Sequence, residues 1–253
     1  MFLCLLLLFF ALFLVVGALF ISNFQRRLPV TSNSRCLLLI AHPDDECMFF
    51  APTIVHLLRQ NCKFYVICAS TGDSEGLGHL RKDELFKSCQ AFGIPEKNVT
   101  LLHVSGLLDG QPKWETEKLA RIVLQHIERL DIDVVITFDE RGISAHSNHI
   151  SCFHALQFLY SNGLVPSDVQ IFILETVSLL RKYIGLLDLY PSFFSSTFMV
   201  ISSPLIAWSS MQKHRTQLVW FRYLYLVFSR YVFLNTLRRI SLHRYMIKNK
   251  KKE

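Results

Sequence analysis

Short apolar runs alternate with longer amphipathic stretches between residues 36 and 174. A short apolar run indicates a strand buried on both faces, and apolar positions that recur every three or four residues indicate a helix. The runs predict strands at 36–40, 64–69, 99–104, 134–138 and 169–174. The intervening stretches predict helices at 47–59, 80–92, 115–130 and 149–160.

Strand followed by helix, repeated with short loops, predicts an α/β fold with a mostly parallel sheet and helices on both faces. Ligands of such sheets bind at the carboxyl ends of the strands. Three polar clusters stand directly after predicted strands, at Ala41–Glu46, Ser70–Glu75 and Asp139–His146. We therefore expect a functional site where these clusters converge.

The first 25 residues contain no charge and are rich in Leu, Phe and Val. This stretch is long enough to cross a hydrocarbon core of roughly 30 Å as a helix. We expect a transmembrane anchor at 1–25 and a linker at 26–34, although the small residues at 16–18 leave a cleaved signal peptide as an alternative. Arg26 and Arg27 follow the span, which predicts that the rest of the chain faces the cytosol.

The net charge of +7 is concentrated in the C-terminal segment. Residues 211–253 hold eleven Lys or Arg and one acidic residue, interleaved with aromatic side chains such as Trp220 and Tyr223. We expect a catalytic domain at 35–210, followed by a segment that lies on an anionic membrane surface. A packed helix with a solvated tail is the alternative. We expect no nucleic-acid binding, since no recognisable module accompanies the charge.

Several hydrolase classes lack support in the sequence. Serine hydrolases of the α/β class carry a G-x-S-x-G motif, and this sequence has none. The acidic neighbours of Cys47 would raise the pKa of its thiol. The cysteines are scattered without a CxxC pair, which favours reduced, buried thiols over a thiolate zinc site, although disulfides are not excluded.

Two His-containing motifs follow predicted strands and fit metal chemistry. They are His42-x-x-Asp45 and His146-x-x-His149. A catalytic zinc site uses three imidazole or carboxylate ligands and keeps a fourth position open. Each motif alone is ambiguous, because an Asp pair after a strand is commonly a helix cap. Their placement on the same edge of one sheet favours a joint site.

These residues also carry a family resemblance. The sequence Ala41-His-Pro-Asp-Asp-Glu46 with a downstream His-x-x-His resembles the LmbE-like deacetylase family, and Thr71-Gly-Asp73 and Arg81-x-x-Glu84 match its less specific motifs. The resemblance spans about residues 36–175 and implies a Rossmann-like fold. It further implies that His42, Asp45 and His149 bind Zn²⁺, with another divalent metal as the alternative. In the same resemblance, Asp44 acts as general base and His146 as acid or oxyanion stabiliser.

Four further residues are candidates for substrate binding. Arg81 and Glu84 are one helical turn apart, so they contact the sugar or phosphate of a substrate or form a surface ion pair. Asp73 and Arg141 follow predicted strands on the same edge of the sheet. There they would contact the substrate or support the side chains that contact it.

Among members of the family, a single N-terminal anchor and this chain length are most similar to the enzyme that deacetylates N-acetylglucosamine linked to phosphatidylinositol. We therefore expect a zinc-dependent hydrolase of GPI-anchor biosynthesis, acting on a membrane glycolipid. Lys250 and Lys251 resemble a dilysine signal of the endoplasmic reticulum membrane. A deacetylase of another N-acetylglucosaminyl conjugate and a non-catalytic scaffold are the alternatives.

Overall fold

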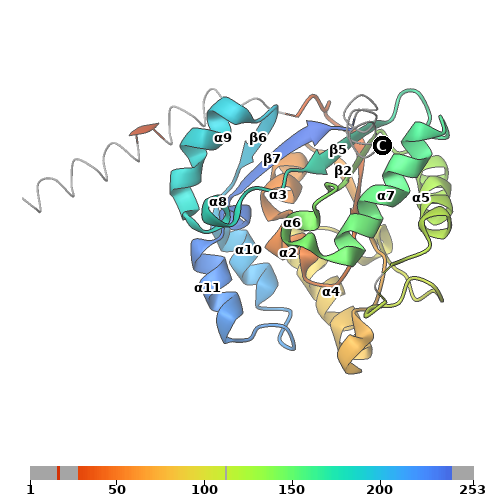
Figure 1. The fold of residues 1–253 in the computed structure, drawn as a ribbon, viewed down its shortest axis with the longest axis horizontal. Helices are drawn as coiled ribbons and strands as arrows, with labels where there is room; N and C mark the ends of the chain where they lie inside the picture. Colours follow the sequence, from red (N-terminus) through yellow and green to blue (C-terminus); the bar gives the residue numbers. More distant parts are fainter. Residues whose placement is uncertain (1–15, 18–27, 112, 241–253) are drawn as a thin grey trace, which may run out of the picture.

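The computed structural model describes residues 16–17, 28–111 and 113–240. These residues form a mixed α/β fold around one seven-stranded sheet, with helices packed against it (Figure 1). The strands are β1 Arg35–Ile40, β2 Lys63–Cys68, β3 Val99–Leu101, β4 Val134–Phe138, β5 Gln170–Leu174, β6 Phe198–Ile201 and β7 Leu234–Arg239.

The sheet has the order β3-β2-β1-β4-β5-β7-β6. Strands β1 to β5 are parallel, and β7 runs antiparallel to both of its neighbours. Strand β1 lies next to β4, so the order reverses direction at this pair, and ligand sites form at such switch points. The expectation of a mostly parallel sheet is confirmed.

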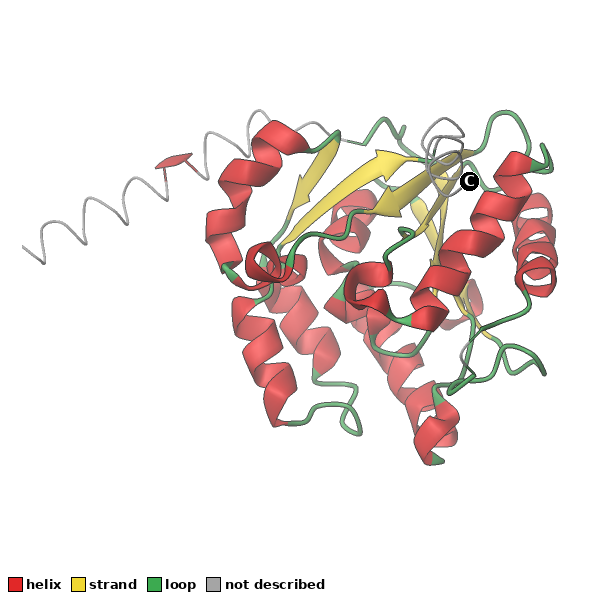
Figure 2. Ribbon diagram, in the orientation of Figure 1, coloured by secondary structure: helices red, strands yellow, loops and turns green. Residues whose placement is uncertain are grey.

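Helices lie between successive parallel strands along the chain, as is typical of such folds. Helices α5 and α7 pack against each other on one face, whereas α3, α4 and α10 cover the other (Figure 2). The α-helices are α2 Asp45–Met48, α3 Ala51–Arg59, α4 Gly78–Phe92, α5 Thr116–Leu130, α6 Gly142–Ala145, α7 Ser147–Ser161, α8 Leu179–Tyr183, α9 Leu189–Ser195, α10 Pro204–Met211 and α11 Trp220–Phe228. Short 3-10 helices are η1 Asp73–Glu75, η2 Glu96–Asn98, η3 Gly185–Asp188 and η4 Arg230–Val232.

The helix expected at 47–59 is two helices in the structure. Helix α2 ends at Met48, and α3 begins at Ala51 with Pro52 in its first turn. Proline lacks an N–H and fits the first turn of a helix but not its interior, which accounts for the break. The short α2 leaves Asp45 at a helix start, directly after β1.

The C-terminal segment is part of the sheet. Strand β7 is inserted between β5 and β6, and its first four residues are buried. The expected domain boundary after residue 210 therefore does not coincide with the end of the fold, which continues at least to Arg239. Within the described part of this segment, residues 211–240, the exposed aromatic side chains lie on α11.

The N-terminal and C-terminal expectations fall largely outside the described residues. The anchor at 1–25 lies there except for residues 16–17, and so do the tail at 241–253 and part of the linker. Within the described ranges, no helix combines the length and the apolar character that crossing a bilayer requires. The six described cysteines are buried and form no disulfide with one another.

Candidate active site

A cavity of about 330 Å³ opens at the carboxyl ends of the parallel strands. Its wall is polar, and both expected His motifs contribute to it. The residues that line it are His42, Asp44, Asp45, Phe49, Ser74, Arg81, Asp109, Ser144, His146, His149, Gln217 and Arg222.

Asp45 is held rigidly at the start of α2. Its Oδ2 accepts hydrogen bonds from the backbone N–H groups of Ala41 (3.0 Å) and His42 (2.8 Å). Its Oδ1 lies 3.1 Å from Nε2 of His149. Burial alone would raise the pKa of the Asp45 carboxyl, but the interactions with His149 and His42 outweigh it and hold that pKa below its usual range. Asp45 is thus an ionised carboxylate.

His149 is oriented by the end of β4 and the loop that follows it. Its ring stacks on Phe138 with 4.0 Å between centroids, and its Nδ1 lies 3.1 Å from the carbonyl oxygen of Gly142. That contact assigns the proton to Nδ1, so the lone pair of Nε2 faces Asp45 Oδ1. Two acceptor atoms at this distance require a cation between them, either a proton or a metal ion.

The loop that carries His146 is built from unusual backbone conformations. Gly142 and Ile143 have φ values of 57° and 63°, and a β-branched residue rarely adopts such a conformation. The segment is held by Asp139, which accepts from the backbone N–H groups of Arg141 and Gly142, and by Thr176, whose hydroxyl accepts from Ile143. This turn is what brings β4 and α7 to the same cavity.

His146 precedes α7 and caps it. Its Nδ1 accepts a hydrogen bond from the backbone N–H of Asn148 at 3.3 Å, which leaves the proton of the neutral ring on Nε2. Burial and the neighbouring rings of His149 and His42 lower the pKa of His146 to about 4. His146 is therefore a neutral imidazole that can donate a hydrogen bond through Nε2.

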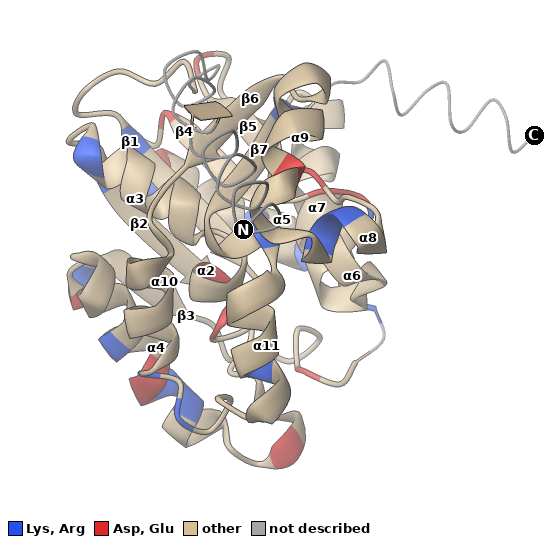
Figure 3. Cartoon of the chain, turned by 90° about the vertical axis from the view of Figure 1, so that its left-hand side faces the viewer, with Lys and Arg blue, Asp and Glu red and all other residues tan. Residues whose placement is uncertain are grey.

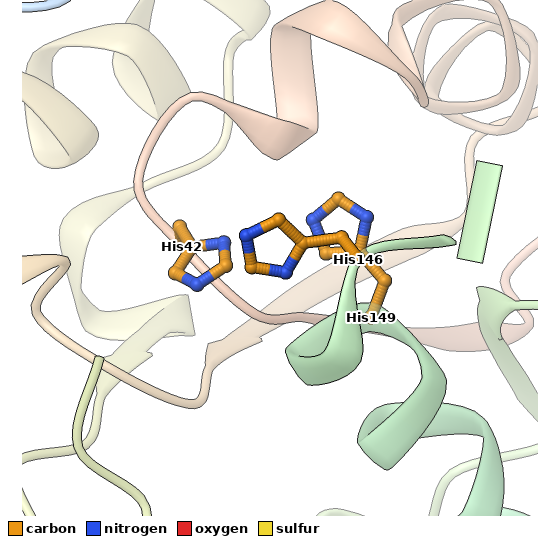
Figure 4. A group of neighbouring side chains, drawn as sticks. All are labelled: His42, His146 and His149. Carbon is orange, nitrogen blue, oxygen red and sulfur yellow. The ribbon is translucent and has the colours of Figure 1, made fainter. Parts of the chain in front are cut away.

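The three histidines converge from two segments of the chain. The rings of His42, His146 and His149 lie side by side, the first at the end of β1 and the others at the start of α7 (Figure 4). Their ligand atoms lie within 4.8 Å of one another, a spacing that can hold a metal ion. Since Asp45 lies beside them, the donor set is imidazole and carboxylate, which suits Zn²⁺.

A loop that the sequence reasoning did not single out also reaches this site. Asp109 Oδ1 lies 3.2 Å from Nε2 of His42, and Asn148 Nδ2 lies 3.1 Å from the same nitrogen. Asp109 follows β3, so it stands at the same edge of the sheet as the other clusters. A search of the chain after every predicted strand, including the third, would have found it.

Asp44 lies between two guanidinium groups. Arg222 Nη2 donates to Asp44 Oδ2 at 3.0 Å, and Arg81 Nη2 lies 3.9 Å from Oδ1. Burial raises the pKa of Asp44, and Asp45 adds to this, whereas Arg222 and Arg81 oppose it. Arg222 comes from α11, far along the chain and outside any motif, so no local sequence signal indicates its place in the site.

The structure brings only one of the four expected substrate-binding residues to the cavity, which is Arg81. It donates to the carbonyl oxygens of Gly72 and Pro43. Asp73 instead accepts from the backbone N–H of Gly78 at the start of α4, and Glu84 accepts from Thr216. Arg141 is exposed and lines a neighbouring hollow beside α8.

Below the cavity lies a second polar cluster, centred on Glu46. Its Oε1 is 2.6 Å from Nε2 of His214 and accepts from Ser88, and its Oε2 accepts from the backbone N–H of Asp44. The side chains of Glu46 and His214 are completely buried. Both carboxylate oxygens of Glu46 already have hydrogen-bond partners within the protein. Glu46 therefore stabilises the turn at Asp44.

The chain is similar to known proteins over the segment that carries both His motifs. The sequence profile of a family described as PIG-L, GlcNAc-PI de-N-acetylase, matches residues 37–159, which include both His motifs. N-acetylglucosaminyl-phosphatidylinositol de-N-acetylase of Bos taurus is 42% identical over 209 residues, which cover 81% of this chain and 83% of the relative. The chain belongs to the GlcNAc-PI de-N-acetylase family.

Another family member is similar over most of its length. The probable N-acetylglucosaminyl-phosphatidylinositol de-N-acetylase of Dictyostelium discoideum is 37% identical over 82% of this chain and 93% of its own. Among solved structures, N,N'-diacetylchitobiose deacetylase of Pyrococcus horikoshii is similar in fold, with a TM-score of 0.61 at 15% identity over 84% of this chain and 85% of that one. The expected α/β fold, similar to that of the LmbE-like family, is confirmed.

Proposed function

We propose that this protein hydrolyses the acetamide of N-acetylglucosaminylphosphatidylinositol, giving glucosaminylphosphatidylinositol and acetate. The observation that carries the proposal is the similarity to relatives of that name over more than four fifths of the chain. The cavity supports it, because Asp44, Asp45 and the three histidines all line one space. An intact set of this kind favours an enzyme over a scaffold.

We propose His42, Asp45 and His149 as the ligands of a Zn²⁺ ion. The tautomer of His149 supports this assignment, since a ligating histidine commonly donates its other N–H to a backbone carbonyl. When bound, zinc would lower the pKa of water from about 15.7 toward about 7 and polarise the acetamide carbonyl. The anionic Asp45 supplies the charge that such a cation needs.

Asp44 is proposed as the general base. It lies next to Asp45 in sequence but faces Arg222 and Arg81 on the cavity wall. A pKa raised by burial makes its carboxylate a stronger acceptor for the proton of the attacking water. The proton would then pass to the amine that leaves the acetyl carbon.

His146 is proposed to stabilise the oxyanion that forms on the acetyl group. We first expected it to act as an acid or an oxyanion stabiliser, and its lowered pKa favours the second role as a neutral donor. Arg81 is proposed to contact the sugar or phosphate of the substrate. For Asp73 and Glu84 the contacts described above favour a supporting role, whereas Arg141 lines a neighbouring hollow outside the cavity.

The proposed setting is the cytosolic side of the endoplasmic reticulum membrane, as a single-pass protein of GPI-anchor biosynthesis. The apolar sequence at 1–25 and the basic segment at 211–253 support contact with a membrane. A lipid-linked substrate has its sugar at such a surface. Another N-acetylglucosaminyl conjugate remains the alternative substrate, and a soluble conjugate tested in parallel distinguishes the two.

Asp44→Asn tests the proposed base. The amide cannot accept the proton, so we expect kcat for acetate release from N-acetylglucosaminylphosphatidylinositol to fall by about 100-fold or more. Asp83→Asn is the matched control, because Asp83 is an exposed carboxylate on α4. Equal activity of the Asp44→Asn variant and the control would refute the assignment.

A further inference from the structure

Exposed apolar side chains of this protein are concentrated on one side. Of the eighteen large apolar side chains exposed in the described residues, fourteen lie between Leu179 and Phe228. They belong to α8, η3, α9, α10, α11 and the residue before α11, and we call them the apolar face. Soluble monomers rarely expose so many neighbouring apolar groups, so this face needs a partner.

Helix α11 is the most apolar part of this face. Tyr225 and Leu226 pack inward, whereas Trp220, Leu224 and Phe228 are exposed, and Trp220 is 74% exposed. The charged residue of α11 is Arg222, whose side chain pairs with Asp44, and Figure 3 shows most of this helix in tan. The helix therefore presents no free charge on its outward side.

The charges of Arg181 in α8, Asp188 in η3 and Arg230 in η4 are paired inside the protein. Asp188 is completely buried between Arg181 and Arg230, with N···O distances of 2.6 Å to each. The residues around them are apolar and open: Leu179 and Leu180 are exposed, and Phe194 is 82% exposed. This arrangement removes charge from the surface and leaves hydrocarbon there.

A groove of about 520 Å³ crosses the same face. It is formed by η3, α10 and α11, and its walls are almost entirely apolar. The side chains that shape it include Leu186, Leu205, Trp208, Leu226, Val227 and Phe233. Its shape and lining suit a hydrocarbon chain.

Three observations favour a lipid bilayer as the occupant. Gly17, within the apolar N-terminal sequence, lies so close to Tyr190 of α9 that any side chain there would collide with the phenol. Lys213 and Arg215 are exposed just before α11, where anionic headgroups would attract them. Trp and Tyr together with Phe and Leu are the residues that prefer the interface of a membrane.

We propose that the apolar face rests in the headgroup and upper acyl region of a bilayer, with its groove holding an acyl chain. This assigns a role to residues 179–208 as well as to α11, and it rests on the proposed function for the identity of the lipid. Arg222 extends from α11 to Asp44, so the face adjoins the cavity. A sugar on a lipid headgroup therefore reaches the proposed base without leaving the membrane surface.

Quenching by brominated lipids tests the proposal. The full chain is reconstituted in vesicles of phosphatidylcholine and phosphatidylserine whose acyl chains carry bromine, with Trp208→Phe in every sample. One sample keeps Trp220, and the matched control carries Trp220→Phe and Leu164→Trp. Leu164 is 46% exposed and lies beyond α7, away from the apolar face, and the buried Trp114 is common to both.

In the sample that keeps Trp220, we expect bromine to quench most of the fluorescence of that residue. In the control, we expect the tryptophan introduced at position 164 to keep its fluorescence. Equal quenching in the two samples, or none in either, would overturn the proposal. So would fluorescence of Trp220 that ignores bromine but changes with protein concentration, because a second copy would then cover the face. The measurement needs neither substrate nor metal, so its outcome is independent of the deacetylation assay.

Discussion

Asp44 has a φ of 112°, a backbone conformation that non-glycine residues rarely adopt. Glu46 stabilises it by accepting from the Asp44 N–H, and Glu46 is itself fixed by His214 and Ser88. A strained turn of this kind persists only when its surroundings hold it in place. His214 is thus a positioning residue for the proposed base, although it does not line the cavity.

His214→Gln should reduce kcat while leaving KM nearly unchanged, because the amide still donates to Glu46 but holds it less firmly. His214→Ala should also lower the free energy of unfolding by about 3–5 kcal/mol, since it leaves a buried carboxylate without its partner. Denaturant unfolding and steady-state kinetics on both variants check these effects. A parallel rise in KM would argue against a role confined to positioning.

The ion pair also predicts a pH dependence. Burial alone would lower the pKa of His214, but Glu46 outweighs it and raises that pKa above 6.5. The stabilisation is therefore complete below about pH 6.5 and declines as the pH rises through the raised pKa. The wild type should exceed His214→Gln in unfolding free energy most between about pH 4.5 and 6.5, because the lowered pKa of Glu46 means that its contribution is lost below this range. A difference that grows toward alkaline pH would contradict the assignment.

Gly142 illustrates a backbone requirement in the site. Its φ is 57°, and a Cβ there would lie 3.0 Å from the Cβ of His149. Gly142→Ala should therefore displace His149 and reduce both bound metal and activity. Gly163→Ala is the matched control, since Gly163 also has a positive φ, 64°, but meets no neighbour within 4 Å. Equal metal content in the two variants, measured by elemental analysis, would count against the ligand role of His149.

The sequence alone indicated the residues of the two His motifs because each motif follows a strand and is local. Asp109, Arg222 and His214 were missed for different reasons. Asp109 stands eight residues after β3, in a loop that contains neither a His-x-x-Asp nor a His-x-x-His spacing. Arg222 and His214 reach the site only because the chain returns to it after β5, a long-range contact that no short pattern predicts.

At the scale of elements, the parallel strands were predictable because burial on both faces requires continuous apolar runs. Strand β7 was not predictable in this way, because its sequence Leu-Asn-Thr-Leu-Arg-Arg contains polar residues. Asn235 is fully buried, accepts from the hydroxyl of Thr53 and donates to the carbonyl oxygen of Phe49. Specific hydrogen bonds, rather than an apolar pattern, place this strand.

Replacing Asn235 with Leu should lower the free energy of unfolding by about 1–3 kcal/mol, because Thr53 and Phe49 then lose a buried hydrogen-bond partner. The paired change with Thr53→Val removes one of these groups and should recover part of the loss. Urea unfolding of the single and double variants measures both effects. No recovery in the double variant would show that packing, not hydrogen bonding, sets the cost.

Helix α11 provides a test of function at the same scale. Changing Trp220, Leu224 and Phe228 to Ser should raise KM for the lipid-linked substrate and leave KM for an acyl-free analogue unchanged. The control changes exposed apolar residues elsewhere, Leu80 and Leu164, to Ser. A similar loss with both substrates would indicate damage to the cavity rather than weaker contact with lipid.

At the scale of the whole molecule, the C-terminal third closes both the sheet and the site. Strand β7 joins β6 to the parallel strands, and α11 supplies Arg222 to the cavity. A prediction that separated residues 211–253 from the catalytic domain followed their composition, which is basic and aromatic. In residues 211–240, buried and exposed positions alternate, so one segment both builds the core and presents an apolar surface.

The central claim is that one metal-dependent site at the end of β1 deacetylates a membrane glycolipid. Its most direct test is acetate release from N-acetylglucosaminylphosphatidylinositol by the membrane-bound protein before chelation, after chelation, and after zinc is restored. We expect activity to disappear with the chelator and to return with zinc. Activity that is indifferent to chelation would contradict the metal mechanism, and no activity under any condition would contradict the substrate assignment.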